Sequence, residues 1–176
     1  MHKKNLKKYY FINKFESTHL INLNKSISFI WRNKDKETDL NTLIKLRDFC
    51  RENNREFYLS NDIKLAIKFN ANGVYISSTN KKLNFKSIKT KKKFKILGSA
   101  HNLKEIKIKE LQEVDEIFLS PIFKSKNNPQ LNIYKYLNLR RVTFMKDISL
   151  GGINNKNIKK LNLINPYGFA GISYFE

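Results

Sequence analysis

The chain has 176 residues, a formal net charge of +20 and 40% hydrophobic residues, which predicts one globular domain with a sizeable core. Its single cysteine, Cys50, excludes an intramolecular disulfide and a cysteine-cluster metal site. No apolar run reaches the length of a membrane span, and residues 1–15 are basic but too polar for a signal peptide. We therefore expect a cytoplasmic protein without a membrane partner.

The positive charge has two interpretations. A basic surface is typical of proteins that bind nucleic acid, and it also attracts phosphorylated small molecules. The lysines are spread along the whole chain, and only KTKKKFK at 89–95 is a dense run, as in a solvated loop. Charge alone therefore leaves both kinds of partner open.

Strands and helices are expected to alternate along the chain. Strands are expected at 9–15, 26–34, 56–60, 73–77, 94–100, 115–123, 148–150 and 168–172. Helices are expected at 39–50 after an Asp39 N-cap, and at 61–70, 83–89, 102–112, 131–139 and 158–164. This alternation indicates parallel βαβ units, and eight strands favour a closed (β/α)8 TIM barrel, an α/β fold.

The barrel is expected to be short. The chain stops just after the eighth strand, so the last helix is expected to be missing. We expect one domain at 9–176, preceded by a basic N-terminal extension at 1–8. Whether the protein forms oligomers stays open.

In such a barrel the chemistry lies at the carboxyl ends of the strands and in the loops after them. Arg32 and Lys34 follow the second strand on the same face as Ile30, whereas Trp31 is expected to face the helices. The alternative is a basic strand end in solvent.

The next four strands also end in polar residues. Hydroxyls, amides, a histidine and a lysine suit a polar or phosphorylated ligand, and caps or turns use the same residue types. These residues lie at 60–62, at 77–80, at Ser99 and His101, and at Ser125 and Lys126.

Gly151 and Gly152 follow the seventh strand. Backbone without Cβ atoms lets N–H groups approach an anion, and a following helix would add partial positive charge. Loops after the seventh and eighth strands form the usual phosphate site of a (β/α)8 barrel. We therefore expect a phosphate to bind there.

Four segments resemble the thiamine phosphate synthase family and its relatives, the thiazole tautomerases. They are IWRNK at 30–34, FYLSNDIKLAIKFNANGVYIS at 57–77, ILGSAHN followed by VDEIFLSPIF, and ISLGGI with GFAGIS at the end. The resemblance covers residues 9–176 and implies a (β/α)8 barrel. It implies a transferase of thiamine biosynthesis, which joins an aminopyrimidine pyrophosphate to a thiazole phosphate with Mg²⁺ and releases pyrophosphate.

The resemblance also implies roles for particular residues. Arg32 and Lys34 match the pair that serves the pyrophosphate, and Ser99 matches the serine that precedes a small residue and a histidine, here His101. The thiazole phosphate site is matched at Gly151, Gly152, Ile172 and Ser173, and more loosely at Ser125 and Lys126.

Two departures concern the metal. Asn61 and Asn80 stand where the family has metal-binding aspartates, which removes two negative charges from a site that Mg²⁺ prefers to be carboxylate. We therefore expect no intact metal site. Two alternatives stay open: a catalytically impaired barrel that binds a phosphorylated ligand or RNA, and a tautomerase-like isomerase with His101 as acid or base.

Overall fold

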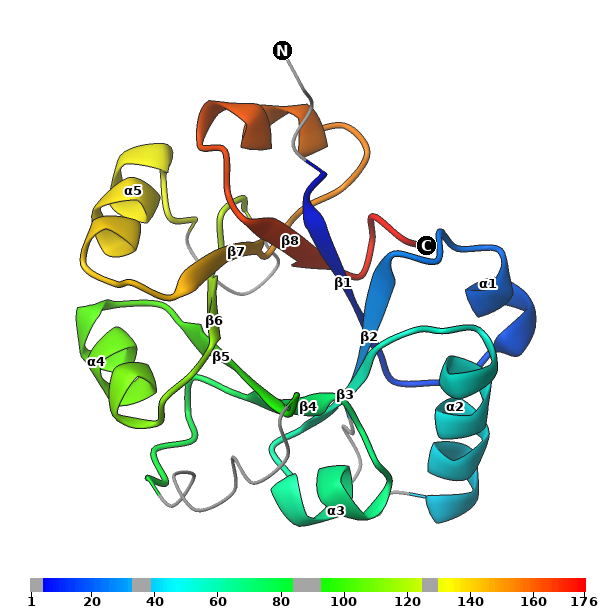
Figure 1. Ribbon diagram of the computed structural model, residues 1–176. Coiled ribbons are helices and arrows are strands. Elements are labelled where there is room, and N and C mark those ends of the chain that lie inside the picture. Colours follow the sequence, from blue (N-terminus) through cyan, green and yellow to red (C-terminus); the bar gives the residue numbers. More distant parts are fainter. Residues whose placement is uncertain (1–4, 33–38, 84–92, 125–129) are drawn as a thin grey trace.

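The computed structural model describes residues 5–32, 39–83, 93–124 and 130–176, which form a closed barrel of eight parallel strands. Each strand pairs with the next, and β8 pairs with β1 to close the ring, with the helices outside it (Figure 1). The strands are β1 (Lys7–Ile12), β2 (Ile27–Trp31), β3 (Phe57–Ser60), β4 (Gly73–Ile76), β5 (Lys95–Ala100), β6 (Glu116–Leu119), β7 (Lys146–Leu150) and β8 (Gly168–Gly171). The expected (β/α)8 fold is confirmed.

The helices are α1 (Ser17–Ile21), α2 (Leu40–Glu52), α3 (Ile63–Lys68), α4 (Leu103–Leu111), α5 (Ile133–Arg141) and a 3₁₀ helix, η2 (Ile158–Leu163). The Asp39 side chain caps α2 by accepting the N–H groups of Asn41 and Thr42, as the sequence predicts. Cys50 of this helix is buried, and burial raises the pKa of its thiol to about 12, so it behaves as a small hydrophobe. In the described residues, no helix has the length and apolar character of a membrane span.

Alternate residues of each strand face the barrel interior and the helices. Tyr9 belongs to the interior cluster and Tyr10 to the outer core. Ile30 likewise faces inward while Trp31 packs in the outer core, which confirms the predicted faces of β2. Arg32, one residue past the strand, therefore continues the inward face at the carboxyl end of the barrel.

Some element boundaries differ from the prediction. The first strand begins at Lys7, two residues earlier than expected, and the short α1 forms where no helix was assigned. The helix expected at 83–89 falls almost wholly outside the described residues. After β7 the chain forms a turn before η2 begins at Ile158, so no helix starts at the glycine pair.

The amino end of the barrel is closed by a network of polar side chains around two carboxylates. Each carboxylate accepts a tyrosine hydroxyl and pairs with a lysine. Glu56 binds the Tyr58 hydroxyl at 3.1 Å and the Lys7 ammonium at 2.6 Å, and Glu116 binds the Tyr9 hydroxyl at 2.7 Å and the Lys95 ammonium at 3.6 Å. The interior is thus a packed core, and a ligand site belongs at the carboxyl end.

Candidate functional site

The mouth of the barrel, at the carboxyl ends of the strands, has an aromatic floor. Tyr75 contacts Phe11 and Phe118 edge to face, with ring centroids 5.0 and 5.3 Å apart. Burial raises the pKa of Tyr75, and a hydrogen bond with the Ser99 hydroxyl and the positive charge of Arg32 oppose the rise. Arg32 and Ser99, both predicted site residues, thus each act on the buried Tyr75 phenol.

Arg32 is held at the strand end by its backbone, because its N–H donates to the carbonyl oxygen of Ile12 at 2.8 Å. Its side chain is exposed and forms no ion pair with any described residue. An exposed guanidinium that no described carboxylate pairs with suits a phosphate or pyrophosphate. Three other predicted residues, Lys34, Ser125 and Lys126, lie outside the described residues.

Gly151 and Gly152 both have left-handed backbone, with φ of 97° and 68°. A Cβ on Gly152 would lie 2.6 Å from the carbonyl oxygen of Lys124, so the loop after β7 packs directly on the loop after β6. The Asn157 amide donates to the Gly152 carbonyl oxygen at 2.8 Å and fixes the orientation of that peptide. Only glycine combines this φ with this close approach.

Backbone donors are available beside this glycine pair. The N–H groups of Gly152 and Ser173 have no acceptor within the described part of the chain, and the Ser173 side chain is exposed. Ile172 is 39% exposed next to it. The predicted helix dipole is absent here, because η2 begins six residues after Gly152. An anion at this place would be bound by N–H groups and a hydroxyl.

Asn61 and Asn80 do meet at the mouth, but their amides are used within the protein. Asn61 Oδ1 accepts the Ser77 N–H at 2.9 Å and the Asn80 Nδ2 group at 3.5 Å, while Asn80 Oδ1 accepts the Lys82 N–H at 3.0 Å. The nearest carboxylate in sequence, Asp62, caps α3 through the Leu65 N–H. These residues do not fit Mg²⁺, since their oxygens are engaged and no described cluster of three metal-ligating side chains exists.

His101 connects two loops. Its Nδ1 donates to the Ser120 carbonyl oxygen at 2.8 Å, and its own backbone N–H donates to Glu105 at 2.7 Å. The side chain lines a cavity of about 510 Å³ that also involves Leu103, Leu131 and Leu139 of the α4–α5 side. The His101 side chain thus links the loop after β5 to the loop after β6.

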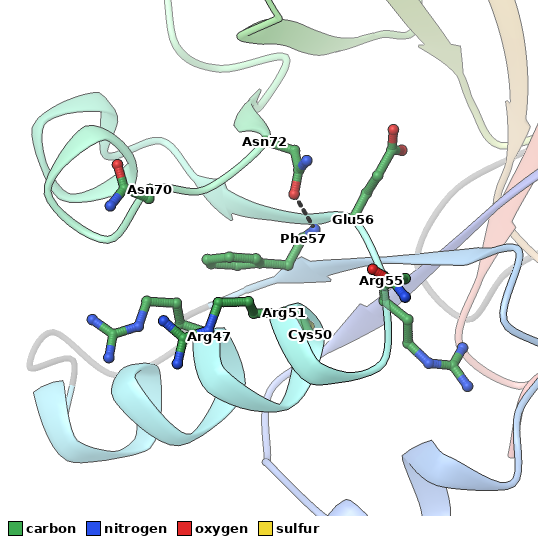
Figure 2. A pocket seen from close by; sticks show the side chains of 9 residues that line it. Arg47, Cys50, Arg51, Arg55, Glu56, Phe57, Asn70 and Asn72 are labelled. Atoms are coloured by element: carbon green, nitrogen blue, oxygen red, sulfur yellow. Dashed lines mark hydrogen bonds between the residues drawn. The ribbon is translucent and has the colours of Figure 1, made fainter.

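A second cavity, of about 550 Å³, lies at the opposite end of the barrel from the mouth. Figure 2 shows Arg47 and Arg51 of α2 on one side of the Phe57 ring and Asn70 on the other. Phe57 starts β3, so this cavity is at the amino ends of the strands, where barrel residues serve stability. Both arginines already pair with Asp48.

Sequence reasoning missed Lys109 and Gln112 on α4. Leu103, Ile106 and Leu111 have helical spacing, which favours a buried face made of these three, but Leu103 is 54% and Leu111 59% exposed. Lys109 and Gln112 are fully buried. Their spacing of three and six residues from Ile106 is the only signal that places them on the inner face.

Known proteins resemble this chain along most of its length. A family model described as thiamine monophosphate synthase matches residues 19–175. The thiamine-phosphate synthase of Pelagibacter ubique is 30% identical over 174 residues, covering 92% of this chain and 81% of the relative. The Haemophilus influenzae enzyme of the same name is 32% identical over 133 residues, covering 72% and 59%.

The fold has close counterparts among solved structures. The thiamine phosphate pyrophosphorylase from Pyrococcus furiosus superposes with a TM-score of 0.75 over 97% of this chain and 87% of that one. At 18% identity, this likeness concerns the fold alone.

Proposed function

This chain belongs to the thiamine monophosphate synthase family, and from that premise we propose that it joins an aminopyrimidine pyrophosphate to a thiazole phosphate, forming thiamine phosphate. The observation that carries the proposal is the pairing of two anion sites at one mouth. One is the exposed guanidinium of Arg32, which with Ser99 acts on the Tyr75 phenol, and the other is the glycine loop, where the N–H groups of Gly152 and Ser173 have no acceptor among the described residues.

Each anion site has one task in this reaction. The bond between the pyrimidine methylene carbon and the pyrophosphate oxygen breaks, and its electron pair stays on the oxygen. The thiazole nitrogen then gives its lone pair to that carbon. Arg32, together with Lys34 two positions on in the sequence, stabilises the leaving pyrophosphate, since fixed cations act most strongly where charge develops.

The glycine loop holds the other substrate. Backbone N–H groups of Gly152 and Ser173 bind the thiazole phosphate, and the Ile172 side chain offers an apolar contact. Tyr75, Phe11 and Phe118 form the aromatic floor below, which keeps water away from the carbocation-like pyrimidine. The two substrates are thereby held in reach of each other.

This interpretation is favoured over the two alternatives. A tautomerase would use His101 as its acid or base, and the bond from Nδ1 to the Ser120 carbonyl oxygen leaves Nε2 as the ring nitrogen for that role. The family assignment favours the synthase interpretation over it. A non-catalytic barrel would not require Arg32 beside Ser99, and the family assignment adds to the synthase interpretation.

The test is incubation of the purified protein with both substrates, in excess Mg²⁺ and in excess EDTA. Thiamine phosphate is measured after oxidation to its fluorescent thiochrome. Arg32→Gln is expected to lower kcat/KM at least about 100-fold, as loss of one charge-stabilising donor does. The control is Arg51→Gln, an exposed arginine at the other end of the barrel, which should leave the rate unchanged. Absence of product at high protein concentration in both conditions refutes the proposal.

A further inference from the structure

A buried ammonium lies beneath the loop that follows β4. Lys109 of α4 is fully buried, and its Nζ donates to the carbonyl oxygens of Ser77 at 2.8 Å and Asn80 at 3.0 Å, and to Gln112 Oε1 at 2.8 Å. Within the described residues it forms no ion pair with a carboxylate. A buried charge held only by carbonyl oxygens is uncommon, because desolvation disfavours it.

Gln112 completes the arrangement from the next turn of the helix. Its Nε2 donates to the carbonyl oxygens of Asn80 at 2.9 Å and Lys82 at 2.8 Å. Two side chains of α4 therefore bind three backbone carbonyls of the loop at 77–82. The neighbouring strand makes room for them, since a Cβ on Gly98 would lie 2.9 Å from Lys109 Cδ.

The loop held in this way carries Asn80 to Asn61. Asn80 Nδ2 lies 3.5 Å from Asn61 Oδ1, which also accepts the Ser77 N–H. The neutral amides thus join the loops after β3 and β4, while the Lys109 ammonium holds the loop after β4 alone. Neither asparagine carries a charge. An anion at the mouth is therefore not repelled by a carboxylate at positions 61 and 80, and no metal is needed there to neutralise one.

We propose that Lys109 and Gln112 are positioning residues that fix the loop at 77–82 from inside the protein, so that pyrophosphate binds at this mouth without a divalent cation. The internal ammonium binds the carbonyl oxygens of Ser77 and Asn80 and so holds the loop after β4 without a bound metal. The identity of the ligand rests on the proposed function, whereas the fixing of the loop does not.

The first experiment measures the loop itself. Lys109→Met keeps the unbranched stem and removes the charge, and Lys107→Met is the matched control, because Lys107 is an exposed lysine on the same helix. Amide hydrogen exchange at 77–82 is expected to rise at least about tenfold in Lys109→Met and to stay unchanged in Lys107→Met. Unchanged exchange in Lys109→Met would overturn the positioning role. If that variant does not fold, Gln112→Leu replaces it, with the same two outcomes.

The second experiment measures binding of inorganic pyrophosphate by calorimetry. The affinity of the wild-type protein in excess EDTA is expected to lie within about tenfold of that in excess Mg²⁺. Lys109→Met should lower the affinity for pyrophosphate in EDTA but leave the affinity for inorganic phosphate at the glycine loop unchanged. General destabilisation of the protein would not produce this difference. If pyrophosphate binds only in the presence of Mg²⁺, the proposal of metal-free binding is overturned. If pyrophosphate binds in neither condition, both that proposal and the proposed function are overturned. The exchange result decides the loop role in every case.

Discussion

Replacement of Gly152 by alanine tests the glycine loop most directly. The new Cβ would lie 2.6 Å from the Lys124 carbonyl oxygen and 2.8 Å from that of Phe123, whereas ordinary contact begins at 3.4 Å. The backbone of the β6 loop would therefore have to retreat by about 0.8 Å. The residue at 152 would also keep a φ of +68°, which an L side chain adopts at a cost of about 1–2 kcal/mol.

These contributions give an expected loss of stability. Alanine restricts the unfolded chain and returns about 0.4–1 kcal/mol, so the strain and the overlap together leave a net loss of about 2 kcal/mol. For a chain of this size, that lowers Tm by roughly 4–8 °C. The displaced Gly152 N–H should weaken phosphate binding at least about tenfold, which corresponds to about 1.4 kcal/mol.

The assay is calorimetry with a thiazole phosphate, together with thermal unfolding of the same samples. Gly171→Ala is the control in the same site, because a Cβ there meets nothing closer than 3.8 Å and its φ is not left-handed. The control should bind and melt like the wild type. The reasoning is refuted if Gly152→Ala also binds like the wild type, or if both variants lose affinity equally.

Three further predictions concern stability. Burial raises the pKa of Glu56, but Lys7, Lys95 and Ser28 together lower it further. Its ionisation therefore stabilises the fold above about pH 4.5, and that contribution disappears as pH falls through the lowered pKa. The free energies of unfolding of Glu56→Gln and wild type, measured in urea, should therefore converge in acid, and a difference that persists there would contradict this. Tyr136→Phe removes the hydroxyl that donates to the buried Asp147 at 3.0 Å and should cost about 2 kcal/mol in urea unfolding, a value that would be near zero if the bond contributed nothing. Asp62→Ala should cost about 1 kcal/mol as a lost helix cap and leave the Mg²⁺ dependence of pyrophosphate binding unchanged, whereas a changed dependence would mean that Asp62 binds metal.

The barrel could be predicted from the sequence because its signals are local. Alternation of strands and helices, the Asp39 cap and the opposite faces of Ile30 and Trp31 each follow from neighbouring residues. The placement of Arg32 at the mouth follows from the same two-residue period. Local periodicity was therefore sufficient for the fold and for one side of the site.

The remaining features depend on partners that are distant in sequence. Hydropathy places a lysine such as Lys109 in solvent, and its acceptor on Ser77 is 32 positions away. The acceptor of His101 Nδ1, the carbonyl oxygen of Ser120, is 19 positions away. No short window of sequence contains these contacts.

The polar network at the amino end of the barrel has a consequence for how such a chain diverges. Tyr9, Tyr58 and their carboxylates hold the strands together at the end remote from the ligand. Residues at the mouth, such as Asn61, lie outside that network. Substitutions at the mouth therefore leave the closure at the amino end in place, which lets the chemistry at one end diverge while the other keeps the barrel together.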